Sequence, residues 1–561
     1  MKRFILIYSC LAVLCFAGCS DFLEEKNKSQ VSLNSGFYDT ELGMESIVSS
    51  CYTTLRFWGG KTFGISMGDS GTDIVADAGC DYPAMANYTN ALGGTDPVCE
   101  FVYNRFYAAI NYCNVALEHI GNVPVSQTRR DKREAEVRFL RAYFYWILVE
   151  SFGDIYYTES STTSVNDKPV KTSVEEVYGK IFADVDFALN SPLSEEQSDG
   201  GRITKWTAKA FKARLLLTRA STLNSADYYE KAYALAKEII DNGPFELNKD
   251  FASVFDMAHS DGNGNKEVIW YVDYSSLNQL YNQEMDDHTI RSGGNHTHLA
   301  YCMKYDDQPG MKRTVEYGRP FVWFMPSRFL LDLYEDENDQ RFEATFRSLW
   351  KENGGSKGDY TLMQDGDTAI YAIRGTATNE MRAWAKNRYQ ILDRTTIYNE
   401  DGSVKNRKQF MSIRKFEDPT RATVSEDRSS RDAFLIRLAE MYLIVAEAGA
   451  KTGKSDALSY MNTLRKTRAV SGKEKEMEVT QNDIEKIDFI LDERGRELVG
   501  EHLRWFDLKR CGVEKFLERI KKGNPDAGKN VAAYHMVRPF PQKFLDAITN
   551  KDEFLQNPQY N

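Results

Sequence analysis

Proline is scarce in this sequence of 561 residues, which has 14 prolines against 31 phenylalanines, 31 tyrosines and 8 tryptophans. The scarcity excludes proline-rich and collagen-like chains. A hydrophobic fraction of 42% and a charged fraction of 27% are those of a globular protein, not of a disordered one. The chain therefore has enough apolar surface for a large core, and aromatic side chains remain for a ligand-binding face.

The sequence also has few long apolar runs and fewer basic residues (71) than acidic residues (82). Beyond the first residues, no stretch reaches eighteen apolar residues, so no further segment is expected to span a membrane. The formal net charge is −11, and no basic patch offsets it. Binding a polyanion would work against this charge, so we expect no nucleic-acid partner.

The cysteine and histidine motifs that bind metals are missing. The nine cysteines contain no Cys-x-x-Cys, and His296 and His298 form a pair without a third ligand. We therefore expect neither a metal nor another cofactor. Outside the first nineteen residues, the sequence leaves the pairing of six cysteines open: Cys51, Cys80, Cys99, Cys113, Cys302 and Cys511.

Segments that resemble catalytic motifs lack the context that the chemistry needs. Residues 64–68 match Gly-x-Ser-x-Gly, but the flanks read as loops, not as the strand and helix that expose a nucleophile. Residues 449–455 resemble a phosphate-binding loop with one residue too few, between two helices. We expect no catalytic residues. A surface glycosidase is kept as a remote alternative, because 82 acidic residues provide carboxylate pairs at many separations.

The first residues resemble a bacterial lipoprotein export signal. Lys2 and Arg3 precede an apolar run over 4–16, and small residues stand before Cys19. Phe16 occupies the position where leucine is commoner. The resemblance implies cleavage before Cys19, lipidation of its thiol, a signal peptide over 1–18 and a tether over 19–40. The acidic run that follows Cys19 is similar to the surface-export signal of Bacteroidetes lipoproteins.

Alanines at steps of three and four residues predict long helices. The expected ranges are 128–152, 173–190, 205–223, 227–241, 432–451, 456–468, 481–500 and 501–521. Paired helices with small residues at their crossings, about 34 residues a unit, are typical of tetratricopeptide-like repeats, with an irregular helical bundle as the alternative. The sequence thus predicts a mainly α protein with a helical scaffold over about 100–245 and 431–525.

The region between these helical blocks has a different composition. Short β-prone runs such as 268–272 and 389–392 lie among loops rich in Gly, Asn and Asp. Together with 58–99, residues 245–430 are expected to form a loop-rich half with short strands. Loops on a rigid scaffold commonly carry binding residues.

Several segments resemble the SusD/RagB family of outer-membrane nutrient-binding lipoproteins, and the match runs nearly end to end. The segments are 134–154, 201–210, 436–448, 493–510 and the ending 539–560, in which Gln559 replaces the usual glycine. The resemblance implies one SusD-like domain over 41–561, with helical repeats packed against the loop-rich half. The spacing of Arg504, Asp507 and Arg510 predicts a buried ion-pair cluster and not a catalytic triad.

The same resemblance implies a function without catalysis. Members of this family sit on the outer membrane, lipid-anchored and facing the medium, above a SusC-like TonB-dependent barrel. They capture oligosaccharides, in some cases peptides, and deliver them to the barrel. Oligosaccharide capture is therefore the leading hypothesis, and peptide capture of the RagB type is the alternative.

A sugar site needs aromatic faces for the C–H side of the rings and polar groups for the hydroxyls. Residues 69–90 and 278–305 offer this mixture, although neither stretch contains a tryptophan, which disfavours a broad indole platform. The candidate ligand-binding residues are Asp73, Asp81, Tyr82, Asn87, Tyr88, Tyr281, Arg291, His296, His298 and Tyr301.

Overall fold

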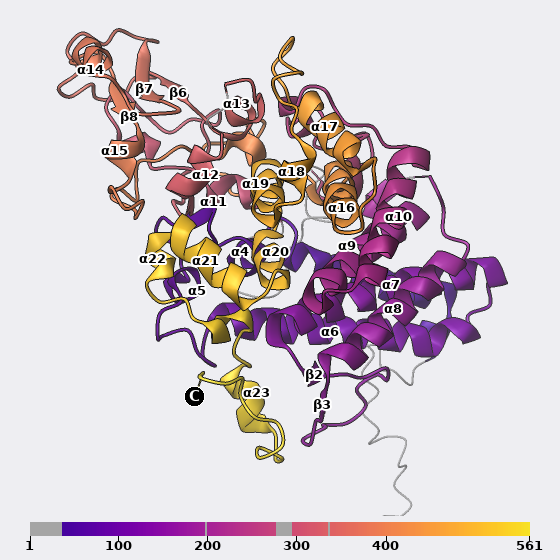
Figure 1. The fold of residues 1–561 in the computed structure, drawn as a ribbon. Coiled ribbons are helices and arrows are strands. Elements are labelled where there is room, and N and C mark those ends of the chain that lie inside the picture. The colour runs from indigo at the N-terminus through magenta and orange to yellow at the C-terminus, as the bar shows by residue number, and fades with distance from the viewer. Residues whose placement is uncertain (1–35, 197–198, 276–293, 335–336, 561) are drawn as a thin grey trace, which may run out of the picture.

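The computed structural model describes residues 36–196, 199–275, 294–334 and 337–560. The predicted signal peptide, most of the tether and the lipidation site Cys19 lie outside the described residues, as do Tyr281 and Arg291. Within them the chain is mainly α-helical, with short strands only, as predicted (Figure 1). In these ranges no helix is long and apolar enough to cross a membrane.

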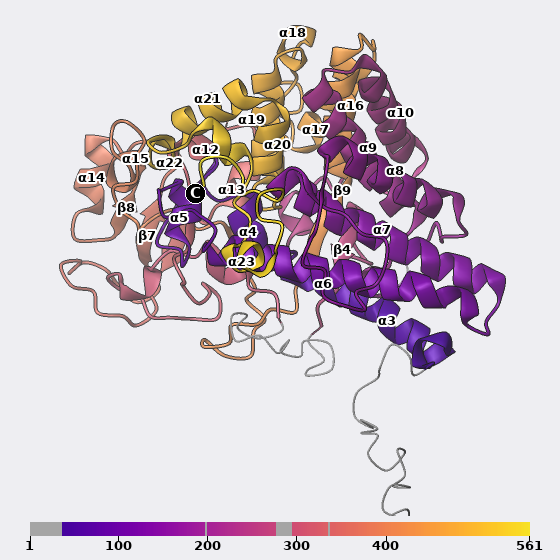
Figure 2. The same ribbon diagram turned by 90° about the horizontal axis from the view of Figure 1, so that it is seen from below.

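The first helical block packs around one large apolar core, in which α3, α6 and α7 lie side by side (Figure 2). Helices α7 to α10 confirm the predicted ranges within one residue at the ends, whereas α3 and α6 were not predicted. Ser173 caps α8, because its hydroxyl accepts from the Glu176 N–H at 3.3 Å. The bounds are α3 (Glu41–Thr53), α6 (Pro97–His119), α7 (Gln127–Phe152), α8 (Val174–Asn190), α9 (Lys205–Leu223) and α10 (Ala226–Asn242).

The second helical block begins with α16 (Leu438–Lys451) and α17 (Ala457–Thr467), and α16 packs against α10 (Figure 1). The crossing of α16 with α17 is tight: a Cβ added to Gly449 would lie 2.7 Å from the Cβ of Ala457. The predicted start of α16 at residue 432 is wrong. Residues Ala433–Arg437 form strand β9, which pairs antiparallel with the buried strand β4 (Val268–Val272).

The two helices predicted over 481–521 are each divided in the structure. Residues 485 and 486 separate α18 from α19, and Gly512, with a positive φ of 90°, separates α20 from α21. The observed elements are α18 (Gln481–Ile484), α19 (Ile487–Leu498), α20 (Arg504–Arg510), α21 (Val513–Gly523), α22 (Pro525–Gly528) and α23 (Gln542–Ala547).

The loop-rich half has its own smaller apolar core. Strand β1 (Val75–Asp77) pairs antiparallel with β5 (Phe324–Pro326), and β6 (Leu349–Lys351), β7 (Thr368–Ala372) and β8 (Gln390–Leu392) form a three-stranded sheet. The β-prone runs at 268–272 and 389–392 are thus confirmed as strands. The remaining elements are α4 (Thr62–Gly68), α5 (Pro83–Asn87), β2 (Ile155–Tyr156), β3 (Lys171–Thr172), α11 (Thr297–Ala300), α12 (Arg328–Asp332), α13 (Arg341–Thr345), α14 (Asn379–Ala385) and α15 (Arg394–Ile397).

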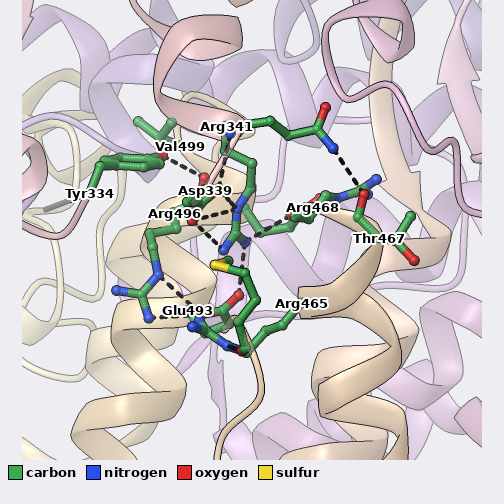
Figure 3. A network of polar contacts seen from close by, with 12 residues as sticks. Tyr334, Asp339, Arg341, Arg465, Thr467, Arg468, Glu493, Arg496 and Val499 are labelled. Atoms are coloured by element: carbon green, nitrogen blue, oxygen red, sulfur yellow. Dashed lines mark hydrogen bonds and ion pairs between the residues drawn. The ribbon is translucent and has the colours of Figure 1, made fainter. Parts of the chain in front are cut away.

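A buried ion network joins the two halves, and we call it the Glu497 network. Glu497 of α19 contacts Arg341 of the loop-rich half at 3.1 Å, and Arg437 and Arg468 of the scaffold at 3.2 and 2.9 Å. Its further members, some of them drawn in Figure 3, are Glu267, Asp339, Lys415, Arg465, Glu493, Arg496 and Glu501.

The six cysteines that the structure describes are all free, and five of them are buried. The part of the chain that is described therefore contains no disulfide, which answers the question that the sequence left open.

Candidate functional site

The turn after β1 brings three of the predicted residues to the surface. The Asp77 carboxylate accepts from the N–H groups of Gly79 and Cys80 at 2.8 and 2.9 Å and from Asn87 Nδ2 at 3.1 Å. These bonds fold the chain back into the short helix α5. Asp81 is exposed, and Tyr82 and Asn87 are half-buried.

The ring of Tyr82 packs on other aromatic rings on the side that faces the core. Its ring stacks on Phe63 of α4 with centroids 5.8 Å apart, and Phe63 stacks on Phe101 of α6 at 4.0 Å. This stack orients the tyrosine ring without covering it completely. A ring that is held in place loses little conformational freedom when a ligand binds to it.

Residues 319–323 lie beside this turn. The Ala78 N–H donates to the Trp323 carbonyl at 3.0 Å and so extends the β1–β5 pairing toward α5. Arg319 stacks over Phe321 at 4.9 Å, and Phe321 meets Trp323 edge to face at 4.6 Å. The indole of Trp323 is only 8% exposed, so Phe321 presents more of its surface here.

Val322, between these two aromatics, has a left-handed backbone with φ 60°. A β-branched residue rarely adopts this conformation, because its Cβ meets the backbone carbonyl, at a cost of about 1–2 kcal/mol. Such strain is concentrated at functional sites. The conformation therefore points to the same surface as the aromatic pair.

Arg407 completes this surface from a distant part of the sequence. Its Nη1 contacts the Asp77 carboxylate at 2.8 Å, while the side chain stays partly exposed. We call Asp81, Tyr82, Asn87, Phe321 and Arg407 the α5 face. Aromatic rings, a carboxylate, an amide and a guanidinium are the groups that bind polyhydroxylated ligands. In the described residues no cluster of three or more His, Cys, Asp or Glu is arranged to hold a metal ion.

Asp73, in contrast, is structural, and its sequence-based assignment as a ligand residue is corrected. The carboxylate is fully buried and contacts Arg504 at 2.6 Å and Arg519 at 3.0 Å. Burial alone would raise the pKa of Asp73, but the two guanidiniums outweigh it and hold the pKa below its ordinary value. A polar residue inside a charged cluster has no contact left for a ligand.

Tyr88 and Tyr301 are also buried, so their assignment to a ligand surface is corrected. Tyr88 lies against the ring of His535 at 4.9 Å between centroids. Tyr301 packs on Phe324 and Phe416 at 6.0 and 6.2 Å. Both rings fill apolar cores and do not form part of the surface.

His296 and His298 complete the set of predicted residues that the structure buries. The pKa of His298 is lowered to about 3, because burial and then the guanidinium of Arg421 disfavour a second positive charge. The imidazole is therefore neutral at physiological pH. It belongs to the interior and is not placed to meet a ligand.

The predicted Arg504–Asp507–Arg510 cluster is buried as expected, and its members also contact other residues. Asp507 contacts Arg494 at 2.7 Å and Arg510 at 3.3 Å, whereas Arg504 turns to Asp73. The serine of the Gly-x-Ser-x-Gly segment, Ser66, is buried within α4, which is no strand-to-helix turn. Neither the ion-pair cluster over 504–510 nor the segment over 64–68 has the geometry of a nucleophile site.

Sequence reasoning missed Phe321 and Arg407 of the α5 face. The apolar run over 321–324, which contains three aromatic residues, was a usable signal, because four consecutive apolar residues after Pro320 suggest a buried strand with an exposed edge. Arg407 gave no signal, since it stands 330 residues from Asp77 in the chain.

Comparisons with known proteins cover almost the whole chain. A model described as "SusD family" matches residues 266–560, and one described as "Starch-binding associating with outer membrane" matches residues 21–217. SusD-like protein P2 of Formosa agariphila is 26% identical over 100% of this chain and 97% of its own length. Starch-binding protein SusD of Bacteroides thetaiotaomicron is 27% identical over 82% of this chain and 78% of its own.

A solved structure shows the same fold. Surface glycan-binding protein A from Bacteroides fluxus superposes with a TM-score of 0.65 at 18% identity, covering 93% of this chain and 99% of that one.

Proposed function

Because this chain belongs to the SusD family, we propose that it is a non-catalytic glycan-binding protein that captures oligosaccharides and delivers them to a SusC-like TonB-dependent transporter. The α5 face carries the proposal: a supported tyrosine ring lies among carboxylate, amide and guanidinium groups. Relatives named for starch and glycan binding support this ligand class.

The proposed location is the outer face of the outer membrane. The match to a model described as associating with the outer membrane begins at residue 21, two residues after Cys19. A lipid on Cys19 would anchor the chain there, because acyl chains contribute about 0.8 kcal/mol for each buried CH₂ group. Metabolic labelling with an alkyne fatty acid, lost in Cys19→Ala, tests the anchor.

Replacing Tyr82 by alanine tests the site. We expect the dissociation constant for a bound oligosaccharide to rise about tenfold, equivalent to about 1.4 kcal/mol, because the ring that stacks on the sugar is lost. Isothermal titration calorimetry measures this, with the ligand chosen from a screen of starch, laminarin, xylan, pectin and mucin oligosaccharides.

Two variants serve as controls for that experiment. Tyr82→Phe keeps the ring and is expected to bind within about threefold of the wild type. Tyr112→Ala removes an exposed ring of α6 outside the α5 face and leaves binding unchanged. Equal affinities of the wild type and Tyr82→Ala would contradict the site. Binding of casein peptides without any glycan would favour peptide capture, and hydrolysis of a bound glycan would favour a glycosidase.

Co-purification tests the partner. Outer membranes that carry an affinity-tagged form of the chain are solubilised in mild detergent, and the captured material is analysed by mass spectrometry. A TonB-dependent barrel in a stoichiometric amount is the expected result. Its absence, while glycan binding persists, would contradict delivery but leave capture in place.

A further inference from the structure

One tryptophan is placed unlike all others in the chain. Of the 8 tryptophans, seven are buried in the cores, whereas Trp384 is 63% exposed. It lies on α14, the connection between β7 and β8. Figures 1 and 2 show the lobe formed by β7, α14 and β8 at the periphery of the molecule, and Figure 1 shows it apart from α5. Leaving an indole in water forgoes a large stabilisation, so its position calls for an explanation other than packing.

The indole is held in place although it is exposed. The guanidinium of Arg388 stacks over the ring at 4.2 Å, and Arg388 Nη1 donates to the Trp384 carbonyl at 3.0 Å. Ala385, the next residue, is buried and attaches the helix to the lobe. One face of the ring is thus covered by a cation, and the high exposure leaves the other face open.

The surroundings of the ring are polar. Glu380, Lys386 and Asn387 are exposed next to Trp384 on α14 or in the turn after it. The Asn387 carbonyl accepts from the Leu362 N–H at 2.9 Å, which fixes the backbone of that turn. A stable protein interface needs roughly 800 Å² from each partner with an apolar centre, whereas the exposed apolar side chains of this lobe are interspersed with charged and amide groups.

More aromatic surface continues along the sheet of the same lobe. Tyr371 of β7 is 36% exposed and lies 6.5 Å from the ring of Tyr389, the residue that follows Arg388. Leu349 of β6 pairs with Tyr371 in the register of the sheet and is exposed as well. Ring surfaces separated by polar groups are suited to a chain of sugar rings, which alternates apolar C–H faces with hydroxyls.

We propose that Trp384 and Arg388 form a second glycan-contact site, on which a pyranose ring of a polysaccharide chain stacks against the open face of the indole. The Arg388 guanidinium holds the indole from its covered face, and the Asn387 amide binds hydroxyl groups at the edge of the sugar ring. The inference rests on the proposed function, since both sites hold one glycan chain. Two sites on one protein molecule raise the overall affinity for a long polysaccharide above that of either site. They do not alter the affinity for a ligand too short to bridge them.

Affinity gel electrophoresis tests the second site, with starch, laminarin, xylan, pectin or mucin in the gel. For the polysaccharide that retards the wild type most, Trp384→Ala is expected to raise the apparent dissociation constant about tenfold. The affinity for a trisaccharide of the same linkage stays within twofold. Trp384→Phe keeps most of the retardation, and Tyr112→Ala, which removes an exposed ring elsewhere, keeps all of it.

Fluorescence provides a readout that does not depend on retardation. Trp384 is the tryptophan most open to acrylamide, and its contribution is the difference between the wild type and Trp384→Phe. Saturation with the polysaccharide is expected to reduce this quenching at least twofold. Unchanged quenching together with unchanged retardation of Trp384→Ala overturns the second site.

The outcomes for the two sites can be told apart. If Tyr82→Ala loses binding while Trp384→Ala binds the polysaccharide like the wild type, the second site is overturned and the proposed function stays intact. If Trp384→Ala loses binding while Tyr82→Ala binds like the wild type, the second site is supported and the α5 face is overturned as a glycan site. If none of the polysaccharides retards the wild type, both proposals are overturned.

Discussion

Glu497→Ala is expected to lower the free energy of unfolding by about 3–5 kcal/mol, the range for breaking a buried ion pair by removing one partner. The carboxylate is fully buried and contacts Arg341, Arg437 and Arg468. Without it, three guanidiniums stay in the interior with fewer opposite charges. The loss is large because desolvated cations remain, not because each contact is strong.

Urea unfolding followed by circular dichroism measures this effect. Glu497→Gln keeps the shape of the side chain and removes its charge, so it is expected to be destabilised nearly as much. Asp227→Asn is the control, since Asp227 forms an exposed pair with Lys231, and exposed ion pairs contribute little to stability. If Glu497→Ala were destabilised no more than Asp227→Asn, the network would not hold the halves together.

The same network predicts a dependence on pH. Burial would raise the pKa of Glu497, but the guanidiniums of Arg468, Arg437 and Arg341 outweigh it and hold the pKa far below the ordinary value of 4.5. The contribution to stability is therefore complete above about pH 4.5 and declines as the pH falls toward the folded-state pKa. In Glu497→Gln this part of the acid dependence is expected to be missing.

Asp73→Asn is the second change with a large expected effect, a loss of about 3 kcal/mol in the free energy of unfolding. Arg504 of α20 and Arg519 of α21 both contact the buried carboxylate, and an amide cannot neutralise them.

Binding distinguishes this structural role from a ligand role. At 10 °C, where the folded fraction is high, the dissociation constant of Asp73→Asn for the oligosaccharide is expected to stay within twofold of the wild type. Thermal unfolding of the same sample should show the lower stability. A normal unfolding transition with lost binding would instead restore Asp73 to the ligand site.

The sequence predicted the parts of the fold that have local causes. Helices α7 to α10 follow from alanine periodicity and from caps such as Ser173, both of which act within a few residues. Strand β9 was mistaken for the start of a helix, because its apolar run is equally compatible with both. Only its pairing with β4, far away in the chain, decides in favour of the strand.

The candidate site was predictable only in part, for a related reason. A stretch rich in Asp, Asn and Tyr indicates hydrogen bonding but does not distinguish a ligand from an internal partner. The partners of Asp73 stand 431 and 446 residues away, so its burial has no local signal. Asp81, Tyr82 and Asn87 stay as candidates because the turn made by Asp77 places them outside.

The free thiols give each half of the protein its own chemical reporter. Cys51, Cys99 and Cys113 lie in the core of the helical scaffold, and Cys80 and Cys302 in the core of the loop-rich half. A buried thiol reacts with an alkylating reagent only when the structure around it opens, so the rate at each cysteine follows the opening of its own core. The order in which the five become alkylated would therefore show whether the two halves open together or one before the other.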